Sequence, residues 1–358
     1  MAFKRMNKKN FISTIVTVVL LLAFTILIKG SIRLPSLINY ILIYSIAALS
    51  LNVICGCLGE FVLGHGGFIL VGYTVAGLIA KFMRGLYEVN EYKQIIYTHA
   101  GCQLHPLGYV FIIVDVLIAA LATGVIGFIV GSIALGRLKG DYLAIVTLGV
   151  SLIFVEVCKN IPALSGLNGV GAASFLGGTT ILYAVFFVLT VALILAFMKS
   201  RFGRSILSCR DDVIAAEACG VDVKKYKIMA FTFASFIAGL AGGLLCHHTK
   251  LIPTDFGLDF SILFLIIIVL GGLGSLTGTV VATIVIVLYE QWFCMESWVP
   301  VFFKNNPKII YGVILVAIML FRSQGILGTS EFSWKWFYNK IKEIWFKIFK
   351  NKTPKEVK

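Results

Sequence analysis

The clearest group of residues that could do chemistry lies in one polar stretch, residues 199–227, which reads KSRFGRSILSCRDDVIAAEACGVDVKKYK. Asp211 and Asp212 suit the N-terminus of a helix, where a carboxylate accepts hydrogen bonds from free backbone amides and meets the positive end of the helix dipole. Residues 213–219 include three alanines and favour helix, and Gly220 suits the left-handed position that ends one. This pattern predicts a short helix with small side chains that docks on a partner, in preference to a solvated connector.

No catalytic, nucleotide-binding or metal-binding motif accompanies this stretch. The chain has neither a G-x-x-x-x-G-K-[ST] phosphate loop nor an H-E-x-x-H motif. Cys55 and Cys57 lack the spacing of metal or redox sites and lie in an apolar run, where free cysteine behaves as a small hydrophobe. His247 and His248 are adjacent, but no further ligands lie near them in sequence. We therefore expect a transport protein that is not an enzyme, with no metal and no cofactor.

A second group of ionisable residues occurs within or beside apolar runs. His65 stands in the glycine-rich stretch GHGG, where it could line a path or form a structural hydrogen bond between helices. Asp115 and Glu156 also lie in or near apolar runs, and a carboxylate inside a membrane is a functional candidate by default. Both could equally lie at the outer membrane interface, which is the position we expect.

The composition indicates that a membrane scaffold positions these groups. Of the 358 residues, 59% are hydrophobic and only 13% are charged, whereas ordinary soluble domains have about 25% charged residues. The chain therefore has too little polar material for a water-facing surface, but lipid would solvate it. The net charge of +14 fits loops that lysine and arginine hold in the cytoplasm better than it fits nucleic-acid binding.

Apolar runs predict an all-α polytopic membrane protein with about ten transmembrane helices. Several runs are shorter than the roughly 20 residues that a straight crossing needs. The third, eighth and ninth are also broken by glycine, which is tolerated only where protein or a water-filled cavity surrounds the backbone, so these are the expected path-lining helices. The expected spans are 11–28, 36–55, 61–80, 108–134, 142–158, 179–198, 227–247, 258–273, 277–293 and 308–321.

The distribution of basic residues predicts that both termini are cytoplasmic. With ten spans and an inner N-terminus, 22 of the 31 lysines and arginines fall in inner segments and 9 in outer ones. The first run begins like a secretory signal, but Lys29 and Arg33 follow it in place of a cleavage site. We therefore expect an uncleaved first helix.

Three regions are expected along the chain. Residues 1–34 form an N-terminal tail and the first transmembrane helix, and residues 35–325 form a transmembrane domain that contains the cytoplasmic loop 199–227. Residues 326–358 form a basic tail in which Trp, Phe and Ile alternate with Lys at near-helical spacing. That spacing predicts an amphipathic helix on the anionic inner leaflet of the membrane.

The polar loop is one of several motifs that together carry a specific resemblance. LNVICGCLGEFVLGHGGFILVGY, GRLKGDYLAIVTLGV and SGLNGVGAAS precede it, and AFTFASFIAGLAGGL and VLGGLGSLTGTVVA follow it. In this order, over roughly residues 35–325, the chain resembles the permease subunits of branched-chain amino acid ABC transporters, and most closely the M-type of their two permeases.

This resemblance implies a function and a set of partners. The chain would be a multi-pass permease of a bacterial inner membrane that forms the path for leucine, isoleucine, valine or a related ligand. Two ATPase subunits would hydrolyse ATP, a homologous second permease would complete the channel, and an extracytoplasmic binding protein would deliver the cargo. The implied surroundings are membrane lipid, and no nucleic acid is involved.

The resemblance also assigns roles to individual residues of the polar loop. The coupling loop of the family, which seats in the ATPase subunits, matches Arg204, Arg210, Asp211, Asp212 and Gly220. Glu217 is acidic in a segment otherwise made of small residues, so we expect a salt bridge from it to a basic residue of an ATPase subunit.

The glycine-rich segments are the expected lining of the translocation path. The candidate residues are Glu60, Gly64, His65, Gly66, Gly271 and Gly272. Two places depart from the family pattern. Members usually carry glutamine where Glu60 stands, so this chain has an additional carboxylate near the membrane. Many members also have Gly-Gly-Pro-Asn-Gly where this chain has Ser165–Gly169, in the outer loop expected to face the binding protein.

Two alternative functions stay open at this point. A urea or short-amide importer has permeases of the same family, and nothing in the sequence identifies the cargo. An ion-coupled secondary carrier would act alone and would need carboxylates near the membrane midplane. Glu60 alone supports that alternative weakly, and the carrier would leave the predicted helix in 199–227 without a role.

Overall fold

The structure is a computed structural model that describes residues 33–86, 106–135, 140–161, 180–249 and 251–291, together with residues 312, 313, 316 and 320. These residues form helices joined by turns, with no strand among them. The all-α prediction is confirmed for this part of the chain. The first expected span, most of the tenth, the 165–174 loop and the basic tail lie outside the described residues.

The helices follow one another through the predicted transmembrane domain. In chain order they are α2 (Arg33–Asn52), the π-helix η2 (Val53–Leu58) that continues it, α3 (His65–Leu86), α5 (Pro106–Ala134), α6 (Asp141–Asn160), α8 (Thr180–Lys199), α9 (Arg201–Asp211), α10 (Val213–Ala218), α11 (Val223–His248), the 3₁₀ turn η3 (Pro253–Phe256), α12 (Leu258–Gly271) and α13 (Leu276–Gln291).

Eight of these helical segments coincide with expected spans. Within the described residues, five are long and apolar enough to cross a membrane: Ser36–Leu58, Val110–Ala134, Asp141–Asn160, Thr180–Lys199 and Val223–His248. Three shorter apolar helices are His65–Ala80, Leu258–Gly271 and Leu276–Gln291. These three correspond to the third, eighth and ninth of the expected spans, and their expected role in lining a path stays a prediction. The total of ten crossings and the cytoplasmic termini stay predictions.

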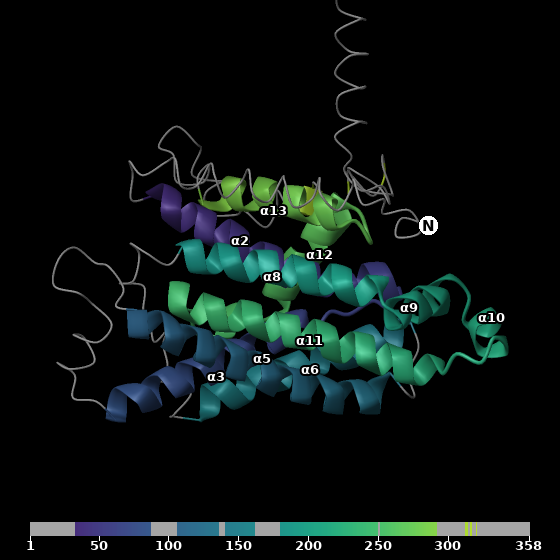
Figure 1. The fold of residues 1–358 in the computed structure, drawn as a ribbon, viewed down its shortest axis with the longest axis horizontal. Helices are drawn as coiled ribbons and strands as arrows, with labels where there is room; N and C mark the ends of the chain where they lie inside the picture. Colours follow the sequence, from purple (N-terminus) through teal and green to yellow (C-terminus); the bar gives the residue numbers. More distant parts are fainter. Residues whose placement is uncertain are drawn as a thin grey trace, which may run out of the picture.

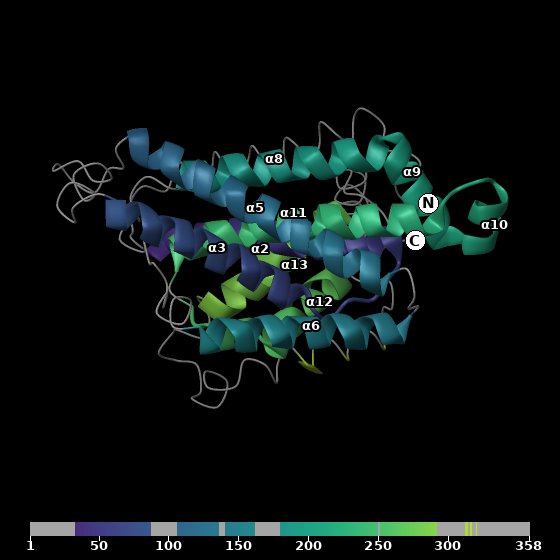
Figure 2. The ribbon, with the colours of Figure 1, turned by 90° about the horizontal axis from the view of Figure 1, so that it is seen from below.

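The long helices lie side by side and alternate in direction, as Figures 1 and 2 show. Helix α8 runs directly into α9, and α11 begins shortly after α10, so α8 and α11 are antiparallel. Helices α9 and α10 lie together at one end of the bundle, on the right in both views. We call this the α9–α10 end. The end of η2 also lies there, because Arg210 of α9 donates a hydrogen bond to the Gly56 carbonyl.

Helix α11 lies at the centre of the bundle and packs on α3 and α5 through small residues. Gly242 lies so close to α3 that a methyl group in its place would overlap the carbonyl oxygen of Ile69, and Gly127 of α5 lies against Ser235 in the same way. Small residues allow the close approach from which membrane helices gain their packing. The outer faces of α5, α6 and α8 instead expose large apolar side chains, as expected for contact with lipid. Examples are Ile133, Ile153 and Ile181.

Candidate functional site

Capping residues set the start of α9 and of α10. The Ser200 hydroxyl accepts a hydrogen bond from the backbone amide of Gly203 at 3.3 Å, at the start of α9. A carboxylate oxygen of Asp212 accepts hydrogen bonds from the amides of Ile214 at 2.9 Å and Ala215 at 3.0 Å, at the start of α10. The short helix predicted after Asp212 is therefore confirmed. Gly220 follows it with a φ of 79°, the left-handed conformation that glycine favours.

Helix α10 has a buried side and an exposed side. Ala216 is buried in a small cluster with Cys209 of α9 and Val223 of α11, which seats α10 on its neighbours. On the other side the Ile214 side chain is 80% exposed, and Glu217 is also exposed. Within the described residues no basic side chain forms an ion pair with Glu217. Helix α10 lies at the far end of the bundle (Figure 1), and it exposes an apolar side chain and a carboxylate there.

The two predicted coupling arginines differ in what they contact. Arg204 is exposed and donates only a local hydrogen bond, 3.1 Å long, to the carbonyl of Lys199. Arg210 points back into the bundle, where its Nη1 donates to the Gly56 carbonyl of η2 at 2.9 Å. Its Nη2 also forms an ion pair with Asp211 at 2.9 Å. Arg210 thus connects α9 to the α2–η2 helix, and its role in coupling stays a prediction.

The end of η2 meets the turn between α12 and α13 in a buried junction. The Asn52 side chain donates to the Ser275 carbonyl at 3.1 Å and accepts from the Gly274 amide at 2.8 Å. Gly56 lies directly against Gly274, and a methyl group at Gly56 would overlap that backbone. The same Gly56 carbonyl accepts from Arg210, so α9, η2 and the α12–α13 turn converge on one residue. We call Asn52, Gly56, Arg210, Gly274 and Ser275 the η2 junction.

Glu60 forms an ion pair with Lys227, in the first turns of α11. Each side chain is only 11% exposed, so the pair lies largely out of water. The additional carboxylate that the sequence suggested near the membrane therefore has a basic partner. This ion pair joins the segment between η2 and α3 to the start of α11, close to the α9–α10 end.

The predicted path residues at the start of α3 form contacts between helices. The Nε2 atom of His65 lies 2.8 Å from the Ser50 hydroxyl and 3.1 Å from the Ala47 carbonyl, both in α2. The Gly66 amide donates to Ser261 of α12 at 2.9 Å. The neighbouring glycine, Gly64, lies against the backbone of α6. His65 therefore makes the helix-to-helix hydrogen bond that was one of its two expected roles.

Gly271 and Gly272 form the start of a tight hairpin. Gly271 ends α12 and faces Gly278 of α13, and a methyl group at Gly271 would lie 2.5 Å from the Gly278 carbonyl. Gly272 has a φ of 108°, which reverses the chain. The two short helices α12 and α13 are thus held together at the turn that meets η2.

The other ionisable residues singled out in the sequence take different positions. Asp115 lies in α5, 4% exposed, with a carboxylate oxygen 3.7 Å from Nε2 of His247. It therefore faces the inside of the bundle. Glu156 is exposed near the end of α6 and pairs with Lys159 at 2.7 Å, as expected for a surface position. No group of three metal-ligating side chains occurs in the part of the chain that the structure describes.

Comparison with known proteins adds the family to this geometry. A family model described as branched-chain amino acid transport system, permease component, matches residues 33–321. The chain belongs to this family. The permease is therefore a multi-pass membrane protein of a transport system, in agreement with its apolar helices.

The relatives of the permease support the M-type resemblance. The high-affinity branched-chain amino acid transport system permease protein LivM of Escherichia coli is 29% identical over 326 residues, which covers 81% of this chain and 69% of the relative. The LivH permease of the same organism is 22% identical over 307 residues, which covers 80% of this chain and 92% of the relative. A probable LivM of Methanocaldococcus jannaschii is 24% identical over 328 residues, which covers 84% and 95%. No solved structure matched the permease.

The permease uses residues that sequence reasoning did not single out. Asn52 holds the η2 junction through its side-chain hydrogen bonds. In the sequence, the signal that could have found it was a single polar side chain in the apolar segment LNVICG. Lys227 neutralises Glu60, but it was counted only as one basic residue among many in its loop. The predicted coupling residues lie at the α9–α10 end. Most of the predicted path residues form contacts between helices inside the bundle.

Proposed function

We propose that this chain is the M-type permease subunit of an ATP-driven importer that carries leucine, isoleucine and valine. It works with two ABC ATPase subunits, a homologous second permease and an extracytoplasmic binding protein. The α9–α10 end lies in the cytoplasm of a bacterial cell, and the opposite end receives cargo from the binding protein. The names of the LivM and LivH relatives and the family match support the cargo class.

The capped helix α10 is the observation on which the coupling role rests. It is too short to be stable alone, so Asp212 and the Ala216 contact hold it in place. Its exposed face offers Ile214 as an apolar anchor and Glu217 as a carboxylate that forms no ion pair within the described residues. A groove of apolar walls with a basic residue at its rim, on each ATPase subunit, would complement this face.

Movement of α10 reaches the membrane helices through contacts that already exist. Arg210 connects α9 to η2, and Asn52 connects that same end to the α12–α13 turn. A π-helical turn such as η2 is rare within an α-helix and frequently occurs at a functional site. When ATP closes the ATPase subunits and shifts α10, we expect η2 and the α12–α13 hairpin to move with it and to switch the path from outward-facing to inward-facing.

The path itself is formed by the helices α3, α12 and α13. The short helices α12 and α13 leave backbone groups at membrane depth, which must be satisfied by protein or by water in a cavity. Gly66 allows α3 to lie close to α12, Gly271 allows α12 to lie close to α13, and His65 fixes α3 to α2. We propose that separation of this group during the cycle opens the path. The binding protein then supplies the affinity for cargo, and the path only has to release it.

The ion pair of Glu60 argues against the secondary-carrier alternative. That alternative needed a free carboxylate to bind a coupling ion, and Glu60 is paired with Lys227. No observation favours a urea or amide cargo over branched-chain amino acids.

The experiment is reconstitution of the permease in vesicles with the second permease, the ATPase subunits and the binding protein. Uptake of radiolabelled leucine should require ATP and the binding protein, and labelled urea should not accumulate. Uptake by this chain alone under an ion gradient would refute the ABC proposal.

Replacement of Glu217 with Lys tests the α10 face. The variant should lose the stimulation of ATPase activity by the binding protein, because like charges would then oppose the basic residue of the ATPase subunit. Glu156→Lys, at an exposed site on α6, is the matched charge change and should preserve stimulation. Full stimulation in the Glu217 variant would remove that residue from the interface.

A further inference from the structure

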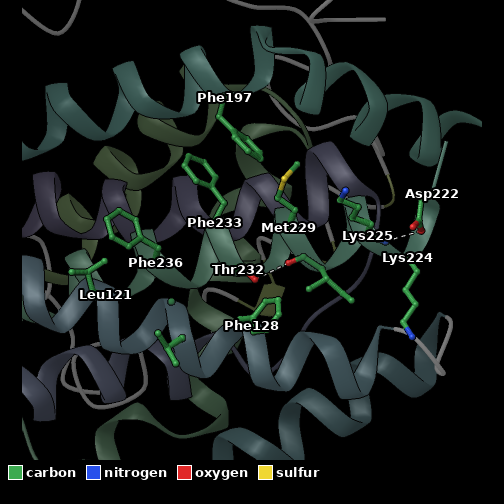
Figure 3. Close-up of a pocket in the computed structure, with 13 residues that line it drawn as sticks. Leu121, Phe128, Phe197, Asp222, Lys224, Lys225, Met229, Thr232, Phe233 and Phe236 are labelled. Atoms are coloured by element: carbon green, nitrogen blue, oxygen red, sulfur yellow. Dashed lines mark hydrogen bonds between the residues drawn. The ribbon is translucent and has the colours of Figure 1, made fainter.

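A groove on the outer surface of the bundle combines an apolar length with a basic end, as Figure 3 shows. It has a volume of about 910 Å³ and runs along α11 between α5 and α8. None of the residues proposed for coupling or for the path lines it. The residues that form its walls and floor include Leu121, Val125 and Phe128 of α5, Phe197 of α8, and Phe233 and Phe236 of α11.

The length of the groove is apolar and open to lipid. Leu121 and Val125 are 61% and 59% exposed, although both are large apolar side chains in a helix that is long enough to cross a membrane. Phe197 and Phe233 stack at 4.1 Å between ring centres and close the side of the groove next to α8. The hydroxyl of Thr232 is the polar side-chain group along this length, and it donates to the Ile228 carbonyl at 2.8 Å. An occupant therefore meets an apolar surface.

The end of the groove is basic. Lys224 and Lys225 lie in the first turn of α11 and are exposed, and neither ammonium group forms an ion pair with a carboxylate among the described residues. Asp222 is the acidic residue beside them, and one of its oxygens accepts from the Lys225 backbone amide at 3.1 Å. The two ammonium groups and one carboxylate leave a net positive charge at the α9–α10 end.

The dimensions of the groove match one leaflet of a bilayer. From Lys225 to Phe236 the helix rises about 16 Å, at about 1.5 Å per residue. Half of a hydrocarbon core of about 30 Å is about 15 Å. A transmembrane helix of a partner would need a groove of about twice this length. Basic side chains between membrane helices attract anionic headgroups.

We propose that this groove binds an anionic phospholipid, with its phosphate at Lys224 and Lys225 and an acyl chain along Phe233 and Phe236. The proposal requires only that the permease lies in a membrane. It is independent of the cargo and of the ATPase subunits, so its failure would leave the proposed transport function intact.

The test is native mass spectrometry of the purified full-length chain with dioleoyl phosphatidylglycerol or dioleoyl phosphatidylcholine. The wild-type chain should bind phosphatidylglycerol more tightly than phosphatidylcholine. Since each lysine near a headgroup contributes roughly 5-fold, Lys224→Gln with Lys225→Gln should reduce this preference by roughly 25-fold. The matched control, Arg201→Gln with Arg204→Gln, removes the same charge from α9 outside the groove and should keep the preference.

A second variant tests the apolar length of the groove independently of its basic end. Val125→Trp fills the groove from an exposed position and should weaken both lipids equally. Equal binding of the two lipids by the wild-type chain would overturn the proposal, as would a preference that survives the double lysine change. A photoreactive residue at position 125 in the assembled transporter should crosslink to phospholipid, and a crosslink to the second permease or to residues 11–28 would also overturn it.

Discussion

The ion pair between Glu60 and Lys227 offers a quantitative test of how the helices near the α9–α10 end of the permease are held together. Three variants are needed: Glu60→Gln, Lys227→Met and the two changes combined. The first introduces an uncharged side chain of nearly the same size and shape. Each single change removes one charge and leaves the other without its partner, whereas the double change removes both.

The expected magnitude follows from the burial of the pair. Both side chains are 11% exposed, so a lone charge would remain largely out of water. Removal of one partner of a buried pair costs about 3–5 kcal/mol of stability, whereas replacement of both by uncharged residues is often nearly neutral. The exposed pair of Glu156 and Lys159, with side chains 61% and 37% exposed, provides the matched control. Its loss should change stability by less than about 1 kcal/mol.

The assay is thermal unfolding of the purified chain in detergent, followed by intrinsic fluorescence. The variants are compared by their unfolding midpoints and not by free energies of unfolding, because such free energies are defined only for two-state unfolding. Each single variant should have a clearly lower midpoint than the wild type, the double variant should recover most of the loss, and Glu156→Gln should match the wild type. A double variant as destabilised as the sum of the two singles would refute the reasoning, because independent sites are additive.

Three further changes test the coupling elements. Arg210→Gln removes the hydrogen bond to Gly56 and should lower the stimulation of ATPase activity by the binding protein severalfold. Arg201→Gln, on the same helix, should leave this stimulation unchanged. Equal stimulation in the two variants would show that the contact between Arg210 and Gly56 has no role in coupling. Asp212→Ala removes the N-terminal cap of α10 and should cost about 1 kcal/mol of helix stability. The first backbone amides of α10 should therefore exchange hydrogen faster than in the wild type. An unchanged exchange rate would contradict the capping role of Asp212. Gly56→Ala places a methyl group against Gly274 and should lower the stability of the permease by about 1–3 kcal/mol. This loss should appear as a lower unfolding midpoint. A midpoint equal to that of the wild type would mean that Gly56 and Gly274 are not in close contact.

Much of the fold could be predicted from local sequence, because the signals are themselves local. A run of about 20 apolar residues is a direct consequence of bilayer thickness, and eight such runs became helices close to their expected bounds. The same holds for α10. Asp212 and Gly220 satisfy the ends of a helix through neighbours two or three residues away, so the pattern DDVIAAEACG predicts the element without its surroundings.

The contacts between helices could not be predicted in this way. Asn52 reaches residues more than 220 positions away, and the identity of its partners depends on how α12 and α13 pack on α2. The contact between the Arg210 guanidinium and the Gly56 carbonyl likewise depends on how α9 packs against η2. The glycines gave a correct signal of close packing, but only the fold determines which helix each of them faces.

The central claim is that α10 passes the closure of the ATPase subunits to the η2 junction. The most direct measurement is uptake of leucine per ATP hydrolysed in vesicles that contain the complete transporter, with Ile214→Asp introduced into α10. The exposed Ile214 side chain supports nothing within the described bundle, so the permease variant should still fold, and the transporter should hydrolyse ATP while uptake per ATP falls at least severalfold. Uptake per ATP equal to that of the wild type would contradict the account.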